Sequence, residues 1–199
     1  MSQPAATAKG SATREAIIER AFEVARFAGV EGLSIGPLAQ AVGMSKSGVF
    51  AHFGSREELQ LAVLDEAATR FGNAVFVPAM AAPRGIPRLR VLMQQWFEWI
   101  RGNSGGCVLL GSVTEYDDRP GPLRDRVLRN EARWRELLRG AVEIAIDAGH
   151  LRPGDPDQYA FELYAIALTL HHQSGLTGYD VARARGDAAV ERWLAANTP

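Results

Sequence analysis

The sequence predicts an all-α protein of about nine helices, in which a small N-terminal helix-turn-helix head precedes a larger helical body. Apolar residues recur at helical spacing over most of the 199-residue chain, which is typical of amphipathic helices. Glycine or proline ends nearly every such run, and no segment alternates between apolar and polar residues as a strand would. The first three helices are short and closely coupled, which sets the head apart from the body.

Residues 1–10 are small and polar, and we expect a disordered arm there. The head is expected over residues 11–55 and the body over residues 56–199. Pro78, Pro83 and Pro87 indicate a linker within the body. The expected helices cover, in chain order, residues 13–28, 34–42, 45–53, 56–71, 88–101, 107–113, 122–148, 157–177 and 181–196.

Composition narrows the class of protein. The net charge is −1, so any basic surface that binds nucleic acid must be local. The single cysteine, Cys107, excludes an intrachain disulfide, and we expect it to be buried instead of sensing oxidation. The N-terminus lacks the apolar run of a signal peptide, and no apolar stretch reaches the ~20 residues of a membrane-spanning helix. We therefore expect a cytoplasmic protein that does not bind membranes.

The stretch "AQAVGMSKSGVFAHFGSREEL" has the layout of a helix-turn-helix. Ala39 is small where two helices would cross, and Gly43 suits the left-handed turn between them. Val49 would face the core from the second helix. No acidic residue lies between Glu31 and Glu57, so this surface suits a phosphate backbone and its slim helix suits a major groove. The alternative is an ordinary helical corner with a solvated face.

Residues 13–64 resemble the DNA-binding head of the TetR family of bacterial transcriptional regulators. The aromatic pair Phe50 and Phe53, followed by "GSREEL", carries the resemblance most clearly. It implies a homodimer that binds double-stranded DNA, most often as a repressor at an inverted repeat, and a body, residues 56–199, that binds a small effector and dimerises. The residues that it places at the DNA are Lys46, Ser47, Gly48, Phe50, His52 and Arg56.

Two of these residues depart from the family pattern. The family commonly has tyrosine at the position of Phe50. A tyrosine hydroxyl can donate a hydrogen bond to a phosphate, whereas the phenylalanine ring cannot. It often has threonine at the position of Gly48, and glycine there weakens the helix by ~1 kcal/mol. We expect Lys9 and Arg14 to add an N-terminal arm.

The body carries aromatic residues at helical spacing, which are more often core than ligand pocket. Side chains with polar ends occur on the same helices as these aromatic residues. The resemblance implies a cavity between such helices. We therefore expect a mainly apolar pocket for an apolar or aromatic effector. Its expected lining is Met93, Trp96, Cys107, Asn130, Trp134, Phe161, Tyr164 and His171.

The last two helices carry more apolar residues than a small body can cover alone. A two-fold four-helix interface would bury that surplus. The residues expected in the dimer interface are Leu163, Ile166, Leu170, Val190, Trp193 and Leu194.

An enzyme and a helical adaptor that binds only protein are the rival classes. The sequence contains no paired catalytic carboxylates in apolar surroundings, no nucleophile elbow, no glycine-rich phosphate loop and no metal motif. His171 and His172 are adjacent and would point about 100° apart on a helix, so they do not suit one metal ion. Glu115, Tyr116, Asp117 and Asp118 are expected in a solvated loop. No cofactor or metal is expected.

Overall fold

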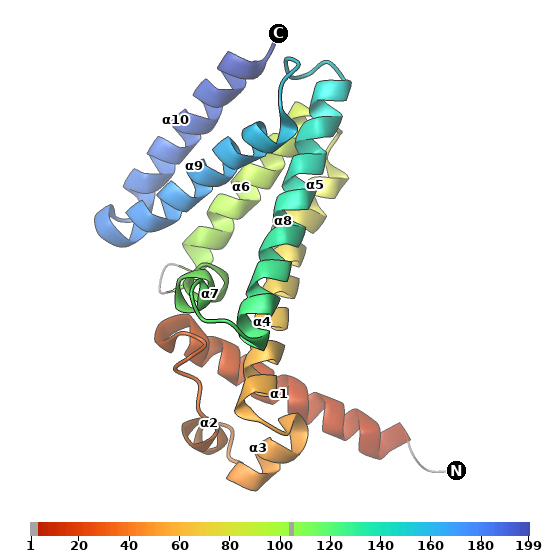
Figure 1. Ribbon diagram of the computed structural model, residues 1–199, viewed down its shortest axis with the longest axis vertical. Helices are drawn as coiled ribbons and strands as arrows, with labels where there is room; N and C mark the ends of the chain where they lie inside the picture. Colours follow the sequence, from red (N-terminus) through yellow and green to blue (C-terminus); the bar gives the residue numbers. More distant parts are fainter. Residues whose placement is uncertain (1–3, 104–105) are drawn as a thin grey trace. The chain divides into compact units, whose positions relative to one another are not determined.

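The computed structural model describes residues 4–103 and 106–199 and is helical throughout its regular elements (Figure 1). The α4, η1 and α5 segments follow one another without a break, so the described residues form nine continuous helical segments, as predicted. The elements are α1 (Pro4–Ala28), α2 (Ile35–Ala41), α3 (Lys46–Phe53), α4 (Arg56–Phe71), the π-helix η1 (Gly72–Phe76), α5 (Val77–Ala81), α6 (Ile86–Gly102), α7 (Val108–Tyr116), α8 (Pro122–Asp147), α9 (Pro156–Thr177) and α10 (Tyr179–Asn197).

Two expectations about local structure are wrong. The first helix begins at Pro4, so most of the expected disordered arm is helical; residues 1–3 lie outside the described residues. The expected linker is shorter than predicted because the helix continues through Pro78 to Ala81. The π-helical turn before it makes this possible: the Val77 N–H bonds to the Gly72 carbonyl, and Pro78, which has no N–H to donate, follows directly.

The chain divides into two compact units. Unit 1 comprises Met1–Thr69 and Gly105–Asn130, and unit 2 comprises Arg70–Ser104 and Glu131–Pro199. The expected head therefore shares its unit with α7 and the start of α8, which are far away in the sequence. That division concerns packing, and the assignment of residues 11–55 to DNA binding remains a prediction.

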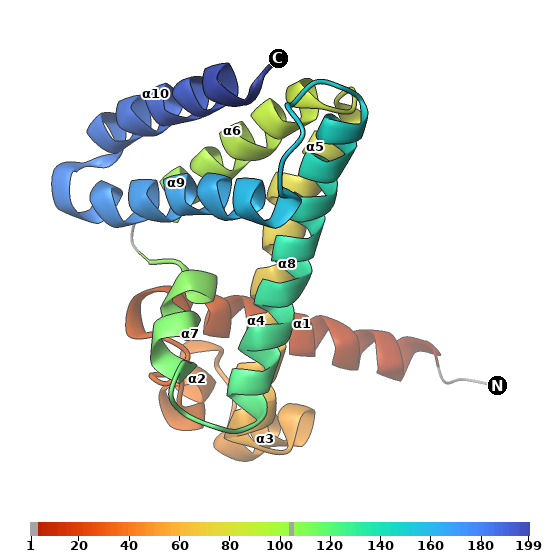
Figure 2. The same cartoon turned by 45° about the horizontal axis from the view of Figure 1, so that its top comes forward.

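Unit 1 has one apolar core. Helices α1 to α4 supply most of it, and Val108, Tyr116 and Val127 join it from α7 and α8. Figures 1 and 2 both show α7 beside the C-terminal end of α1. The two approach closely at Gly106, where an added Cβ would lie 1.7 Å from the Arg26 carbonyl oxygen.

The end of α7 holds the turn that follows α1. The Glu115 carboxylate accepts hydrogen bonds from the backbone N–H groups of Val30, at 3.0 Å, and Glu31, at 3.2 Å. Gly29 makes room for it, because a Cβ there would lie 1.7 Å from the carboxylate. The Tyr116 hydroxyl donates to the Glu31 carboxylate at 3.1 Å. Glu115 and Tyr116 thus lie in an ordered helix end, not in the solvated loop expected from the sequence.

Both partners in the Tyr116–Glu31 hydrogen bond have a pKa that is shifted from its ordinary value. Burial and the bond to Glu31 raise the pKa of Tyr116. Burial acts to raise the pKa of Glu31 as well, but hydrogen bonds from Arg56 and Tyr116 outweigh it and lower that pKa. The stabilisation from ionised Glu31 is therefore present above its unfolded-state pKa and is lost as the pH falls through its folded-state pKa.

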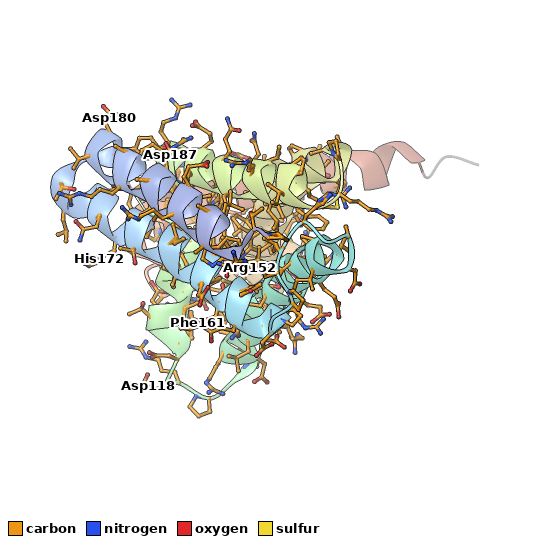
Figure 3. The ribbon with its side chains drawn as sticks, turned by 90° about the horizontal axis from the view of Figure 1, so that it is seen from above. Asp118, Arg152, Phe161, His172, Asp180 and Asp187 are labelled. Carbon is orange, nitrogen blue, oxygen red and sulfur yellow. The ribbon has the colours of Figure 1, made fainter. Side chains whose placement is uncertain are left out.

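Unit 2 is built on the antiparallel pair α9 and α10, with α6 packed against both (Figure 2). Gly186 lets α10 approach closely, because a Cβ there would lie 2.4 Å from Leu170 and 3.3 Å from Phe97. Arg152 lies in the loop before α9 and holds the end of α10 (Figure 3). Its backbone N–H donates to the Asn197 carbonyl, and its side-chain Nε donates to the Thr198 carbonyl.

We predict that Glu115→Ala lowers the free energy of unfolding by about 1–3 kcal/mol, because two backbone donors lose their acceptor. Glu115→Gln keeps a carbonyl oxygen and should lose less. Glu136→Ala, on an exposed face of α8, is the control and should change stability by less than about 0.5 kcal/mol. Urea unfolding measures all three, and equal losses for Glu115→Ala and Glu136→Ala would contradict the role of Glu115.

Candidate functional site

The predicted helix-turn-helix is formed by α2, residues 42–45 and α3. Gly43 has φ +66°, the left-handed conformation expected from the sequence. The Met44 N–H donates to the Ala39 carbonyl at 2.9 Å and closes the turn. Ala39 and Val49 are buried on the inner sides of their helices, as predicted.

The N-terminus of α3 is capped and open to solvent. The Ser45 hydroxyl accepts from the Gly48 N–H at 3.1 Å and lies 3.1 Å from the Ser47 hydroxyl. Lys46 and Ser47 are exposed, and the Lys46 chain passes over Gly36, where a Cβ would lie 3.1 Å from its Cε. A small residue at position 36 therefore leaves room for the only lysine of this surface.

The rest of the outer face of α3 is small or apolar. The Phe50 side chain is 51% exposed. Ala51 is exposed, Gly48 is half-buried, and His52 is half-buried in the last turn. The arrangement offers a slim helix with one cation, two hydroxyls and the positive end of its dipole on one side.

Arg56, which the sequence predicts at the DNA, makes hydrogen bonds within the protein, and its contact with a phosphate stays a prediction. Its Nε donates to the Leu33 carbonyl at 2.7 Å, and its Nη2 donates to the Glu31 carbonyl and, at 3.1 Å, to the Glu31 carboxylate. The residue ties the start of α4 to the turn before α2. Its role in this structure is to position the helix-turn-helix.

The expected N-terminal arm is also different. Arg14 lies within α1, and its guanidinium stacks over the ring of Phe53 at 4.9 Å. It therefore packs on the end of α3 instead of reaching outward. Lys9 belongs to the same helix.

Unit 2 contains a cluster of five aromatic rings, which we call the aromatic cluster. Phe71 makes edge-to-face contacts with three tryptophans, and Trp96 also contacts two further rings of the group. The Tyr164 hydroxyl donates to the Glu131 carboxylate at 2.8 Å. The members are Phe71, Trp96, Trp99, Trp134 and Tyr164.

Only part of the expected effector lining belongs to this cluster. Trp96, Trp134 and Tyr164 do, and Met93 is buried on α6 in the same unit. Phe161 is wrong as a lining residue, because it is 67% exposed on α9 (Figure 3). His171 is half-buried on α9, where burial and the neighbouring His172 lower its pKa.

The remaining two expected lining residues belong to unit 1. Cys107 is buried at the start of α7, and the Asn130 amide donates to the Leu64 carbonyl at 3.4 Å. Sequence reasoning missed the central position of Phe71, which reads only as an inward apolar residue near the end of a long helix.

Most of the expected dimer residues are buried within the chain itself, so that expectation needs correction. They pack where α9 and α10 meet or face α6; they are Leu163, Leu170, Val190, Trp193 and Leu194. Ile166 is only half-buried. It lines a groove of about 450 Å³ between α9 and α10, together with Leu170, Thr169, Gln173, Arg185 and Ala189.

No group of three or more His, Cys, Asp or Glu side chains within residues 4–103 and 106–199 is placed to hold a metal ion. Within the same residues no helix has both the length and the apolar character that a membrane crossing requires.

Family models match both parts of the chain. The model "Bacterial regulatory proteins, tetR family" matches residues 17–63, and "Tetracyclin repressor-like, C-terminal domain" matches residues 85–190, which is more than half of the chain. No curated protein matches the sequence.

Solved structures share the fold over nearly the whole chain. A TetR regulator from Chloroflexus aurantiacus is 26% identical, with a TM-score of 0.83 and 94% of each chain covered. AibR, solved with isovaleryl coenzyme A and operator DNA, is 23% identical, with a TM-score of 0.69 over 87% of this chain and 96% of that one. A regulator from Saccharomonospora viridis, solved with choline, is 22% identical, with a TM-score of 0.76 over 91% and 96%.

The helix-turn-helix geometry, the helical body and the two family matches agree with one another. The matched segments also include the residues that carry the resemblance seen in the sequence, from Ala39 to Leu59. The chain therefore belongs to the TetR family of bacterial transcriptional regulators, whose members bind DNA and are not enzymes.

Proposed function

We propose that the protein is a repressor that binds an inverted-repeat operator as a homodimer and leaves it when a small apolar or aromatic effector binds. The exposed face of α3 carries the first half of this proposal. It presents Lys46, Ser47 and a solvent-exposed helix N-terminus beside small side chains, a shape that fits a major groove. Cytoplasmic location accompanies this function.

A mobility-shift assay with the DNA upstream of the protein's own gene tests the proposal. A specific, salt-sensitive complex is expected. A helical adaptor would give no complex with any DNA, and binding equal to that of random DNA would exclude an operator in this region.

The outer face of α9 and α10 supports the dimer. The groove beside Ile166 is lined mainly by apolar atoms, and the exposed Leu176 and Val181 lie close to the turn between the two helices. A second copy would cover these residues, and two α3 helices could then enter successive major grooves about 34 Å apart.

The continuity of α4 supports effector release. Its first residue, Arg56, bonds to the turn before α2, and its last, Phe71, is the centre of the aromatic cluster. An effector that displaces Phe71 acts on the same helix that positions the helix-turn-helix. The two binding events are then linked reciprocally, typically by about 1–3 kcal/mol. Two proteins of this fold, one solved with isovaleryl coenzyme A and operator DNA and one with choline, support a small-molecule ligand.

We predict that Lys46→Ala weakens binding to all DNA sequences and reduces the slope of log affinity against log salt by about one unit, because one phosphate contact is lost. Arg56→Ala is the matched control, since its charge is already engaged within the protein. It should leave the salt slope unchanged while lowering stability. Fluorescence anisotropy at several salt concentrations measures both, and the reverse pattern would restore Arg56 as the phosphate contact.

We predict that Ser47→Ala reduces affinity for the operator more than for random DNA, because its hydroxyl is exposed at the N-terminus of α3. Competition with random DNA in the same assay gives the ratio. An equal loss on both DNAs would mean that Ser47 contacts only the backbone.

We predict that Ile166→Glu converts the dimer to a monomer, because the charge would be buried in the interface. Val77→Glu, at a residue that is 59% exposed on α5, is the control and should leave the dimer intact. Sedimentation at micromolar concentration distinguishes them, and a wild-type monomer would refute the interface.

A further inference from the structure

Two buried hydrogen-bond donors in the aromatic cluster have no acceptor. The indole Nε1 atoms of Trp99 and Trp134 are inaccessible to solvent and bond to no protein group. Trp193, in the same unit, shows the ordinary arrangement: its Nε1 donates to the Glu162 carboxylate at 2.6 Å. Buried donors are nearly always satisfied in folded proteins, so two exceptions in one cluster need an explanation.

The two rings that carry these donors share one neighbour, Phe71. Phe71 packs edge to face against both rings, with centroid separations of 5.6 Å to Trp99 and 4.6 Å to Trp134. Trp134 is only 7% exposed, and Trp96 closes one side of it with a centroid separation of 4.9 Å. A ligand that took the place of Phe71 would therefore contact both of the indole rings that carry unsatisfied N–H groups.

We propose that the aromatic cluster binds a neutral molecule with an aromatic or apolar body and a carbonyl-type acceptor, held by the indole N–H groups of Trp99 and Trp134. This inference rests on the proposed function and specifies the effector class. A carbonyl oxygen has two lone pairs and can accept from both donors. Such a contact would satisfy groups that are otherwise buried without a partner, which makes the acceptor worth more here than in water.

The charges around the cluster favour a neutral ligand. Glu131 bonds to Tyr164 and lies three residues before Trp134 on α8, so the two share one face of that helix. Its carboxylate would repel an anionic ligand. A cation would meet the positive edges of two indoles, whose N–H groups attract an acceptor instead.

The backbone next to the cluster supplies a place where it can open. Phe71 is followed directly by the π-helix η1, and nothing lies within 4 Å of a Cβ added at Gly72. Single π-helical turns within helices occur often at functional sites. A shift there would move the Phe71 ring away from both indoles and admit the ligand.

The test uses two probes of nearly the same shape, acetophenone and ethylbenzene, which differ in one carbonyl oxygen. The chain has four tryptophans, so its ¹H–¹⁵N spectrum should show four indole N–H signals. Acetophenone should move the Trp99 and Trp134 signals downfield and leave the Trp193 signal in place. Ethylbenzene should produce no downfield shift. Trp99→Phe, Trp134→Phe and Trp193→Phe assign the signals.

Affinities from the same titrations give a second readout. Ethylbenzene is the more hydrophobic probe, so burial alone predicts that it binds more tightly. We expect the opposite order, with acetophenone tighter by about threefold to tenfold. Trp134→Phe keeps an aromatic ring but removes one donor and should reduce this ratio, whereas Trp193→Phe should not. If Trp134→Phe fails to fold, the wild-type shifts and the order of affinities still decide.

Three results would overturn the proposal. Unmoved Trp99 and Trp134 signals would mean that these N–H groups face aromatic rings and are not ligand donors. Tighter binding of ethylbenzene would identify a purely apolar site, and tighter binding of phenyltrimethylammonium or benzoate would identify a charged ligand. If acetophenone binds as expected but operator affinity is unchanged, the site stands and the proposed effector release falls.

Discussion

The Glu115 carboxylate is an acceptor that links the end of α7 to the turn before the helix-turn-helix. It accepts hydrogen bonds from the backbone N–H groups of Val30 and Glu31, at the start of the turn between α1 and α2. Arg56 bonds to two carbonyls of the same turn from the start of α4. The helix-turn-helix follows this turn directly, so α2 and α3 inherit their position from contacts made by α7 and α4. The helix-turn-helix looks self-contained in the sequence, but residues of α4 and α7 also hold it in position.

The helix-turn-helix could be predicted from the sequence because its determinants are local. Gly43, Ala39 and Val49 fall within eleven residues, and each restricts the backbone or the packing in only one way. The role of Glu115 could not be predicted, because its partner Val30 is 85 residues away. Arg56 shows the same limit. An arginine next to a recognition helix fits a phosphate contact equally well until the Leu33 carbonyl is found beside it.

The body shows what helical periodicity in the sequence can and cannot predict. It predicts which residues of α6, α8 and α9 point inward, and it places Trp96, Trp134 and Tyr164 there correctly. Periodicity cannot show which helix faces pack against each other. For this reason it predicts Phe161 inside the body, and it predicts in a dimer interface five residues that are buried between α9 and α10. The unpaired indole donors are a three-dimensional property as well, because a tryptophan in a sequence gives no indication of whether its N–H finds an acceptor.

Methylation protection with dimethyl sulfate tests whether α3 enters the major groove of an operator. The reagent modifies N7 of guanine in the major groove and N3 of adenine in the minor groove, so it reports which groove the protein occupies. On the DNA upstream of the gene, guanine protection is expected in two patches about one helical turn apart, and Lys46→Ala should need a higher protein concentration to give the same protection. Protection confined to adenines, or equal protection by wild type and Lys46→Ala at every protein concentration, would show that α3 does not bind the major groove in this way.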